Sequence, residues 1–349
     1  MDARMGELVE KLAENHGLEP AEYEYLLTHV DGEARAVLAE RARAAREPRY
    51  GRTVFIRGLI EVTSYCKNDC YYCGLRVSNA ACERYRLTEE EILACANAGY
   101  ELGFRTFVLQ GGEDVRYTDE RLCAIVSALK GAYPACAITL SAGERSHESY
   151  ARLRAAGADR YLLRHETADP AHYARLHPAS MSWERRMACL RSLRSLGYAV
   201  GCGFMVGSPF QTPATLAADL AFIQEFSPEM CGIGPFMPHH ATPFAGEPAG
   251  SLEQTLALLS IIRLIKPAIL LPATTALGTL HPHGWELGME AGANVVMPNL
   301  SPADVRGKYL LYDGKPCSDV EAARSRRILE ERMERIGYRV VTDRGDPCL

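Results

Sequence analysis

The segment Ile60–Arg76, IEVTSYCKNDCYYCGLR, decides the fold because it holds three closely spaced cysteines. Cys66, Cys70 and Cys73 are separated by three residues and then by two. So short a loop brings the three thiolates together, and thiolates bind zinc and iron–sulfur clusters. Zinc sites usually take two ligand pairs far apart in sequence, whereas a four-iron cluster held by three cysteines keeps one iron open. We therefore expect a 4Fe-4S cluster, with a zinc site or three core cysteines as alternatives.

Composition narrows the class of protein. A chain of 349 residues can bury a large core, as one large domain or two ordinary ones. The net charge is -5 and the basic residues are scattered, so nucleic acid is not an expected partner. The N-terminus is charged and helical in pattern, and no run of about 18 apolar residues occurs. We expect a cytoplasmic protein without membrane contact, whose twelve cysteines stay reduced.

Short apolar runs alternate with helical patterns from residue 57 onward, which is typical of parallel α/β folds. The expected strands are Arg57–Thr63, Thr106–Gln110, Ala137–Ser141, Arg160–Arg164, Ala199–Val206, Met230–Pro235, Ile269–Ala273 and Asn294–Met297. The helices expected between them are Thr88–Leu102, Asp119–Lys130, His147–Ala155, Trp183–Leu196, Pro213–Glu225, Leu252–Ile265 and Trp285–Ala291. Eight such units predict a (β/α)8 TIM barrel, and a six-unit partial barrel is the alternative.

The chain divides into three expected parts. Residues 1–50 form an N-terminal cap of two or three short helices, and residues 51–301 form the barrel. Residues 302–349 form a C-terminal extension that packs on the barrel, with a final helix near Val320–Ile336.

Polar and glycine residues follow the expected strands, where chemistry sits in parallel barrels. Those after strands two, three, four, seven and eight include Gln110, Gly111, Gly112, Glu113, Ser141, Glu166, Thr274, Thr275 and Met297. A pair of glycines exposes backbone carbonyls that can hold an ammonium group, although it can also form a simple turn.

The cysteine loop resembles the CxxxCxxC loop of the radical S-adenosylmethionine (SAM) superfamily. Tyr72 matches the aromatic residue before the third cysteine, and the sequence from Gly111 to Glu113 matches the GGE motif. The resemblance implies a 4Fe-4S cluster whose open iron chelates the amino and carboxylate groups of SAM. The implied ligands of the cluster are Cys66, Cys70 and Cys73.

Five longer segments narrow the resemblance. CYYCGLR (70–76), YLLRHETADP (161–170), GIGPFMPHHATP (232–243), PATTALGT (272–279) and ANVVMPNLSP (293–302) are similar, in order, to the FeFe-hydrogenase maturase HydE family. That family has a complete barrel with a closed internal cavity. The resemblance places SAM against Tyr72, Gln110, Gly111, Gly112, Glu113, Ser141, Glu166, Arg186 and Met297. It places the substrate near Arg57, Thr274, Thr275, Tyr309 and Tyr312.

Three charged residues have simpler interpretations as well. Arg186 can pair with a carboxylate, but it can also be a solvated helix charge, and the adjacent Arg185 competes for the role. Glu166 can accept hydrogen bonds from ribose hydroxyls, or it can form a salt bridge with Arg160 or Arg164. Arg57 is hard to explain by packing, because an arginine that faces into a barrel needs an anionic partner.

The resemblance implies an oxygen-sensitive radical SAM enzyme that cleaves SAM reductively to a 5′-deoxyadenosyl radical. Its implied substrate is a cysteine-ligated Fe(CO)2CN precursor of the diiron subcluster of the FeFe-hydrogenase H-cluster. The implied partners are other maturases of the pathway and an electron donor such as ferredoxin or flavodoxin. Alternatives are a methylornithine-synthase-like mutase, a biotin-synthase-like sulfur-insertion enzyme, and a scaffold without catalysis that carries an iron fragment.

The remaining cysteines are expected to have no ligand role, and the histidines near strand exits could contact the substrate, although surface or supporting roles are favoured. Some family members hold a second cluster near the C-terminus, but here Cys317 alone stands in that region. Core packing is expected for Cys82, Cys95, Cys123, Cys136, Cys189, Cys202, Cys231 and Cys348, and surface or supporting roles for His239, His240, His281 and His283.

Overall fold

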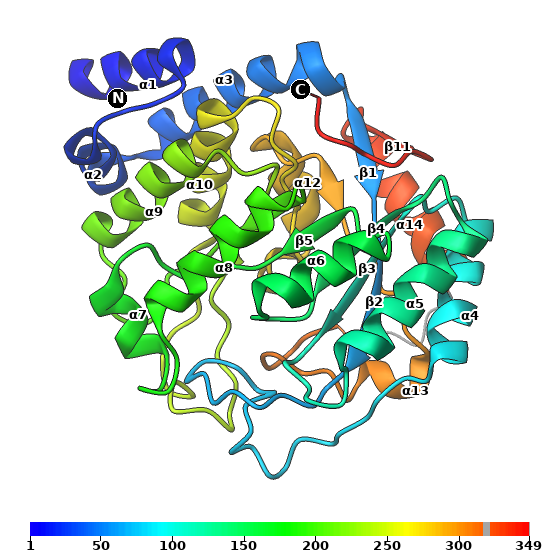
Figure 1. The fold of residues 1–349 in the computed structure, drawn as a ribbon. Coiled ribbons are helices and arrows are strands. Elements are labelled where there is room, and N and C mark those ends of the chain that lie inside the picture. Colours follow the sequence, from blue (N-terminus) through cyan, green and yellow to red (C-terminus); the bar gives the residue numbers. More distant parts are fainter. Residues whose placement is uncertain (317–321, 349) are drawn as a thin grey trace.

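Three helices precede the barrel in the computed structural model, which describes residues 1–316 and 322–348. They are α1 (Ala3–Asn15), α2 (Pro20–His29) and α3 (Gly32–Tyr50). The α2 helix packs on α9 (Pro213–Phe226) and α3 packs on α10 (Leu252–Ile265), so the three helices cover one side of the outer helix layer (Figure 1). The expected number of helices is confirmed, although α3 has 19 residues and is not short.

Parallel strands form the wall of the barrel. One sheet contains, in order, β2 (Gly58–Thr63), β3 (Thr106–Gly111), β4 (Ala137–Ser141), β5 (Arg160–Leu162), β6 (Ala199–Cys202) and β8 (Met230–Cys231). The gap between β8 and β2 is bridged by residues 270–299. Single parallel bridges join Met230 to Leu270 and Pro272 to Val295, and β10 (Val295–Val296) pairs with β1 (Thr53–Ile56). The expected eightfold barrel is therefore confirmed, and the six-unit alternative is wrong.

Several strands differ from the prediction in detail. The first strand begins earlier, at Thr53, and is divided at Arg57 into β1 and β2. The expected fifth and sixth strands are each divided, which adds β7 (Met205–Val206) and β9 (Gly234–Pro235). The expected strand Ile269–Ala273 is reduced to single bridges. Proline at position 272 has no N–H to donate, which explains why a regular ladder does not form there.

All seven helices expected between the strands are present. They are α4 (Glu89–Glu101), α5 (Asp119–Ala132), α6 (His147–Ala155), α8 (Trp183–Ser195), α9, α10 and α12 (Gly284–Glu290). The expected capping box opens α4, where the Thr88 side chain accepts from the Glu91 N–H. The prediction missed α7 (Pro170–Leu176), α11 (Thr275–Leu280) and α13 (Ala303–Arg306), because two turns or fewer show little periodicity.

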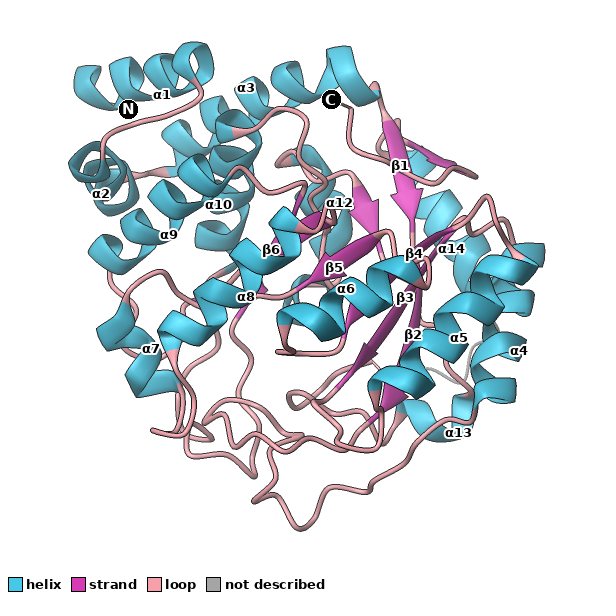
Figure 2. Cartoon of the chain, viewed as in Figure 1, coloured by secondary structure: helices cyan, strands magenta, loops and turns pink. Residues whose placement is uncertain are grey.

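The loops that leave the C-terminal ends of the strands gather at one end of the molecule, in the lower part of Figure 2. The cysteine loop follows β2 and lies among them. None of the described helices is long and apolar enough to span a membrane.

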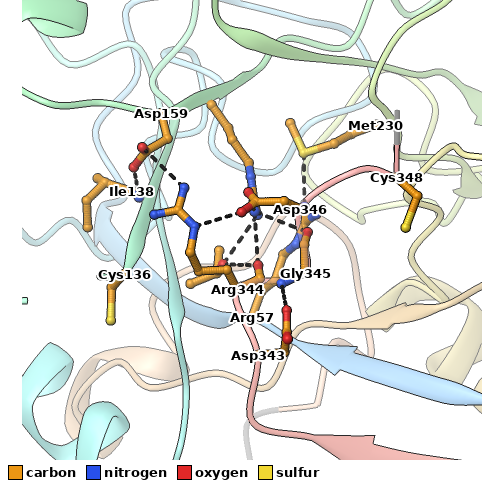
Figure 3. A network of polar contacts seen from close by, with 12 residues as sticks. Arg57, Cys136, Ile138, Asp159, Met230, Asp343, Arg344, Gly345, Asp346 and Cys348 are labelled. Atoms are coloured by element: carbon orange, nitrogen blue, oxygen red, sulfur yellow. Dashed lines mark hydrogen bonds and ion pairs between the residues drawn. The ribbon is translucent and has the colours of Figure 1, made fainter. Parts of the chain in front are cut away.

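The C-terminal segment closes the opposite end of the barrel. After α14 (Ala322–Arg335), β11 (Arg339–Val341) pairs with β1, and the chain then crosses the start of β3 and β5 (Figure 3). Arg160, at the start of β5, donates to the carbonyls of Arg344 (2.9 Å) and Gly345 (3.1 Å) and to the Asp346 carboxylate (2.6 Å). The expected division of the chain at residues 50 and 301 stays a prediction.

We expect Asp346→Asn to lower the free energy of unfolding by about 1 kcal/mol at neutral pH, because the buried Arg160 then loses its half-exposed carboxylate partner. Burial raises the pKa of Asp346, but hydrogen bonds from Arg344 and Arg160 lower it further below 3.8. A carboxyl with a lowered pKa stabilises the fold above its ordinary pKa and loses this effect as the pH falls through the folded value.

Urea unfolding across a pH series measures this difference. The advantage of the parent protein over the variant should be constant at neutral pH and shrink below pH 3.8. Glu24→Gln, at an exposed position of α2, is the control. Equal stability of Asp346→Asn and the parent at every pH would contradict the prediction.

Candidate functional site

A cavity of about 350 Å³ lies inside the barrel. Every residue that the sequence analysis placed in the cluster, SAM and substrate sites lines it. These are Cys66, Cys70, Tyr72, Cys73, Gln110, Gly111, Gly112, Glu113, Ser141, Glu166, Arg186 and Met297, together with Arg57, Thr274, Thr275, Tyr309 and Tyr312. Predicted site residues as far apart in the sequence as Arg57 and Tyr312 thus face one cavity. Their chemical roles stay predictions.

The cysteine loop is held by contacts with the rest of the protein. The Asp69 carboxylate accepts two hydrogen bonds from the Arg76 guanidinium, at 2.6 and 2.7 Å. Backbone bonds tie the loop to three other segments, from Lys67 N–H to Glu113 O (3.0 Å), Tyr71 N–H to Leu176 O (3.0 Å) and Gly74 N–H to Leu311 O (2.9 Å). The loop therefore has a defined shape before any ligand binds.

The three thiols fit a multi-iron cluster better than a single ion. Burial raises the pKa of Cys66 and Cys70, and it raises the pKa of Cys73 to about 12, so the free thiols are protonated at neutral pH. In the part of the chain that the structure describes, the three sulfurs do not all lie within 4.8 Å of one another. Ligands of one zinc ion, each at 2.3 Å, would be about 3.8 Å apart. The donor set therefore favours a cluster.

Two glycines let β3 approach the cysteine loop closely. A Cβ atom on Gly112 would lie 2.3 Å from the Tyr65 carbonyl oxygen and 2.7 Å from Cys66 Cβ. A Cβ atom on Gly111 would lie 2.8 Å from Thr63 Cγ2. Both positions thus exclude a side chain, which supports a cradle beside the thiols rather than a simple turn.

Arg186, and not Arg185, lies in the cavity wall. Its Nε donates to Glu144 Oε1 at 2.6 Å, and its Nη1 donates to the Arg164 carbonyl at 2.8 Å. The Arg185 side chain is 63% exposed and lies 3.2 Å from the other Glu144 oxygen. Arg186 is therefore the arginine that faces the cavity, and its contact with the SAM carboxylate stays a prediction.

Glu166 has an unusual backbone conformation. Its φ angle is 66°, in the left-handed region, and the residue is 7% exposed. Its Oε2 lies 3.3 Å from Arg164 Nη2, so the expected salt bridge is present, but no described residue donates a hydrogen bond to this oxygen. A non-glycine residue held in this conformation costs about 1–2 kcal/mol, and such strain collects at functional sites.

Arg57 lies deep in the cavity, near the C-terminal tail (Figure 3). Its Nη1 contacts Met230 Sδ at 3.0 Å, while Nε and Nη2 have no hydrogen-bond partner among the described residues. Burial and the nearby Arg160 lower the pKa of Arg57, and Asp346 partly offsets this. A buried guanidinium with free donors is a site for an anion.

The sequence analysis missed a buried ion pair in the cavity wall. Lys315 Nζ donates to Glu61 Oε1 and to the Tyr309 carbonyl at 2.8 Å, and Asn299 donates to Glu61 Oε2 at 2.9 Å. A carboxylate inside the apolar strand β2 was a usable signal for Glu61. Lys315 lies in a loop without periodicity, so nothing marked it.

The predicted tyrosines and Thr274 also have protein partners. Tyr309 OH accepts from Gln110 Nε2 at 3.4 Å, and Tyr72 OH lies 3.1 Å from His177 Nε2. Tyr312 OH lies 3.5 Å from Thr279, and Thr274 Oγ1 accepts from the Leu277 N–H at the start of α11. These contacts fix the orientation of the hydroxyl groups in the wall.

The other cysteines and histidines lie outside the described cavity wall. His240 Nδ1 lies 2.8 Å from Asp313 Oδ1, and His239 Nδ1 accepts from the Ala241 N–H. Each ring therefore has a hydrogen-bond partner within the protein. Core packing is confirmed for the buried Cys95, Cys136, Cys189, Cys202 and Cys231, while Cys82, Cys123 and Cys348 are only partly buried and pack against the edge of the core. Cys317 lies outside the described residues.

Comparisons with known proteins agree with this site. Residues 60–223 match the family model of the Radical SAM superfamily. The chain is 46% identical over 267 residues to the [FeFe] hydrogenase maturase subunit HydE of Thermotoga maritima, covering 76% of each chain. It is 30% identical over 297 residues to 3-methylornithine synthase of Methanosarcina barkeri, covering 84% of this chain and 83% of that one.

Solved structures show the same fold. Methylornithine synthase (PylB) has a TM-score of 0.83 at 28% identity, with 96% of this chain and 97% of that chain covered. HydG, a maturase of the [FeFe]-hydrogenase, has a TM-score of 0.79 at 21% identity, with coverages of 97% and 76%. At that identity the second likeness concerns the fold alone.

The barrel, its cysteine loop and these matches define a radical SAM enzyme. Within that class the chain belongs to the family of the [FeFe] hydrogenase maturase subunit HydE. Membership of the superfamily implies a 4Fe-4S cluster and SAM as cofactors.

We expect Gly112→Ala to reduce cluster loading severalfold, because the new methyl group would collide with Tyr65 and Cys66. The measurement is iron bound per chain after anaerobic reconstitution. Gly131→Ala in α5 is the matched control, since nothing lies within 4 Å of its Cβ position. Full iron content in Gly112→Ala would show that the close approach is not needed.

Proposed function

We propose that this chain is a hydrogenase maturase that processes a cysteine-ligated Fe(CO)2CN precursor toward the diiron subcluster of the H-cluster. The observation that carries the proposal is Arg57, a buried guanidinium with two free donor atoms, in the same cavity as the cysteine loop. The 46% identity to the HydE subunit supports it.

Cys66, Cys70 and Cys73 would hold the cluster, and the turn after β3 would hold SAM beside them. When bound, these groups would supply a 5′-deoxyadenosyl radical by one-electron cleavage of SAM. Gly111 and Gly112 let the turn after β3 approach the cysteine loop closely, so SAM bound at this turn would lie next to the cluster. The remaining proposed SAM contacts are Tyr72, Gln110, Glu113, Ser141, Glu166, Arg186 and Met297.

Two of these side chains are already oriented by the protein. Arg186 is held by Glu144 and by the Arg164 carbonyl, so little side-chain entropy is lost when it binds the SAM carboxylate. Glu166 lines the cavity with an oxygen that lacks a hydrogen-bond donor in the described chain. Ribose hydroxyls are donors of the right kind for this oxygen.

The proposed substrate site combines the positive charge of Arg57 with polarisable thioether side chains. The Glu61–Lys315 pair is internally balanced, so Arg57 would compensate the charge of an anionic complex. The thioethers of Met205, Met230, Met237 and Met297 line the same cavity and are polarisable. Polar contacts would come from Thr274, Thr275, Tyr309 and Tyr312.

The proposed reaction requires other proteins as partners. One-electron cleavage needs a reductant, so we include ferredoxin or flavodoxin as the donor. Supply of the iron precursor and use of the product require other maturases. A cytoplasmic location is part of the proposal, because these proposed partners would have to be reached there.

A mutase acting on an amino acid is the second candidate, because 3-methylornithine synthase matches 84% of this chain. In that case Arg57 would bind the substrate carboxylate. Sulfur insertion of the biotin synthase kind is less well supported, at 30% identity over 62% of the chain.

The first test is anaerobic reduction of the cluster-loaded protein with SAM and chromatographic detection of 5′-deoxyadenosine. We expect the parent to form this product and Cys70→Ser to form none, because the cluster loses a ligand. Absence of product from fully loaded parent protein would favour the scaffold interpretation. A cysteine-bound iron dicarbonyl cyanide complex and an amino-acid panel then separate the two candidate substrates by their effect on SAM consumption.

A second test separates the two arginines. Arg186→Lys should raise the KM for SAM by about tenfold, because lysine cannot form a bidentate pair with a carboxylate. Arg185→Lys is the matched control and should stay within about twofold of the parent, because its side chain is mostly solvated. Equal effects of the two substitutions would refute the assignment.

A further inference from the structure

Two buried ionisable side chains, His165 and Asp219, lie directly behind the cavity wall. Both are 0% exposed, and neither lines the cavity that the structure describes. His165 follows β5 and precedes Glu166. Asp219 lies on α9, and its carboxylate contacts the His165 ring. The proposed chemistry of the cavity uses neither of them.

The hydrogen bonds fix the protonation of His165. The Gly203 N–H donates to His165 Nδ1 at 3.2 Å, so this nitrogen carries no proton. The proton is therefore on Nε2, which donates to Asp219 Oδ1 at 3.2 Å. The same carboxylate oxygen accepts the Ala168 N–H at 2.5 Å. Asp219 thus sets both the tautomer and the ring orientation of His165.

Gly203 connects this pair to Glu166 through the two peptide bonds that flank its Cα atom. Its N–H is bound by His165, and its carbonyl oxygen accepts the Glu166 N–H at 3.0 Å. Gly203 has a φ angle of 149°, and a Cβ atom there would lie 2.1 Å from the Gly232 carbonyl oxygen. Gly203 is therefore fixed between two neighbouring segments, and Glu166 is attached to a rigid point.

We infer that Asp219 and His165 are positioning residues that hold Glu166 in its left-handed conformation and thereby aim its carboxylate at SAM. The inference rests on the proposed role of Glu166. The segment from Glu166 to Ala168 is held on both sides, at its start through Gly203 and at its end by Asp219 directly.

Packing alone does not explain the pair. His165 lies between the rings of Phe204 and Phe222, with centroids 5.8 and 4.8 Å away, so an apolar residue would suit the site. A buried polar pair adds little net stability over apolar residues of similar volume. What it adds here is a directed hydrogen bond to the N–H of Gly203, the residue whose carbonyl oxygen binds the strained Glu166 backbone.

The experiment compares His165→Phe with His165→Asn in cluster-loaded protein. Phenylalanine fills the space but removes both hydrogen bonds, whereas the asparagine oxygen can replace Nδ1 as the acceptor for Gly203. We measure the Kd of S-adenosylhomocysteine, which is not cleaved, the thermal unfolding temperature, and deuterium exchange of the peptide that covers residues 163–168.

We expect His165→Phe to unfold near the parent temperature, to bind S-adenosylhomocysteine about tenfold more weakly and to exchange faster at residues 163–168. His165→Asn should restore most of the affinity. Ser260→Ala on α10, also buried and polar, is the control and should bind like the parent. If His165→Phe does not fold, Asp219→Leu takes its place, with the same expected loss of affinity.

The variant Glu166→Gln distinguishes failure of the positioning role of His165 from failure of the proposed SAM contact of Glu166. If Glu166→Gln binds weakly but His165→Phe binds like the parent, the positioning role is wrong while the proposed function stands. If Glu166→Gln itself binds like the parent, its proposed SAM contact is wrong and the inference falls with it. Equal losses in His165→Phe and His165→Asn would also overturn the inference.

Discussion

The close contact between the cysteine loop and the end of β3 is the constraint on which the rest of the site depends. It leaves no space for a side chain at Gly112, and it brings the backbone of one strand exit against Tyr65 and Cys66 at the start of the loop. The loop has no regular secondary structure of its own and takes its shape from the segments around it. The barrel therefore acts as the rigid support that turns three flexible cysteines into a defined set of donors.

Charge is distributed unevenly along the cavity. Near the cysteine loop, Arg186 and Glu144 are paired, and Glu61 and Lys315 form a second balanced pair in the wall. Arg57 differs, because the neutral Met230 sulfur is the only hydrogen-bond acceptor that its side chain has among the described residues. Burying an ion without a counterion is costly unless a ligand supplies one. An anionic substrate at the proposed position would compensate this charge.

The sequence predicted the ring of eight units because the alternation of strands and helices is a local pattern. Glycine and polar residues at the strand exits marked part of the cavity wall, whereas Arg57, Arg186, Tyr309 and Tyr312 were assigned to the site from the family resemblance. Contacts between distant segments escaped prediction. Lys315 reaches Glu61 from a loop, and β11 joins β1 across most of the chain. The left-handed Glu166 was also missed, since its conformation comes from His165 and Gly203 rather than from its own side chain.

The pairing of β1 with both β10 and β11 has a consequence for how the barrel closes during folding. Among the described residues, both strands that pair with β1 lie far along the chain from it, at Val295–Val296 and Arg339–Val341. Contacts of such large sequence separation form slowly, because the intervening chain must be ordered first. The side of the barrel next to β1 therefore closes only when these two late strands are in place, so the wall of the cavity depends on contacts that span most of the described chain.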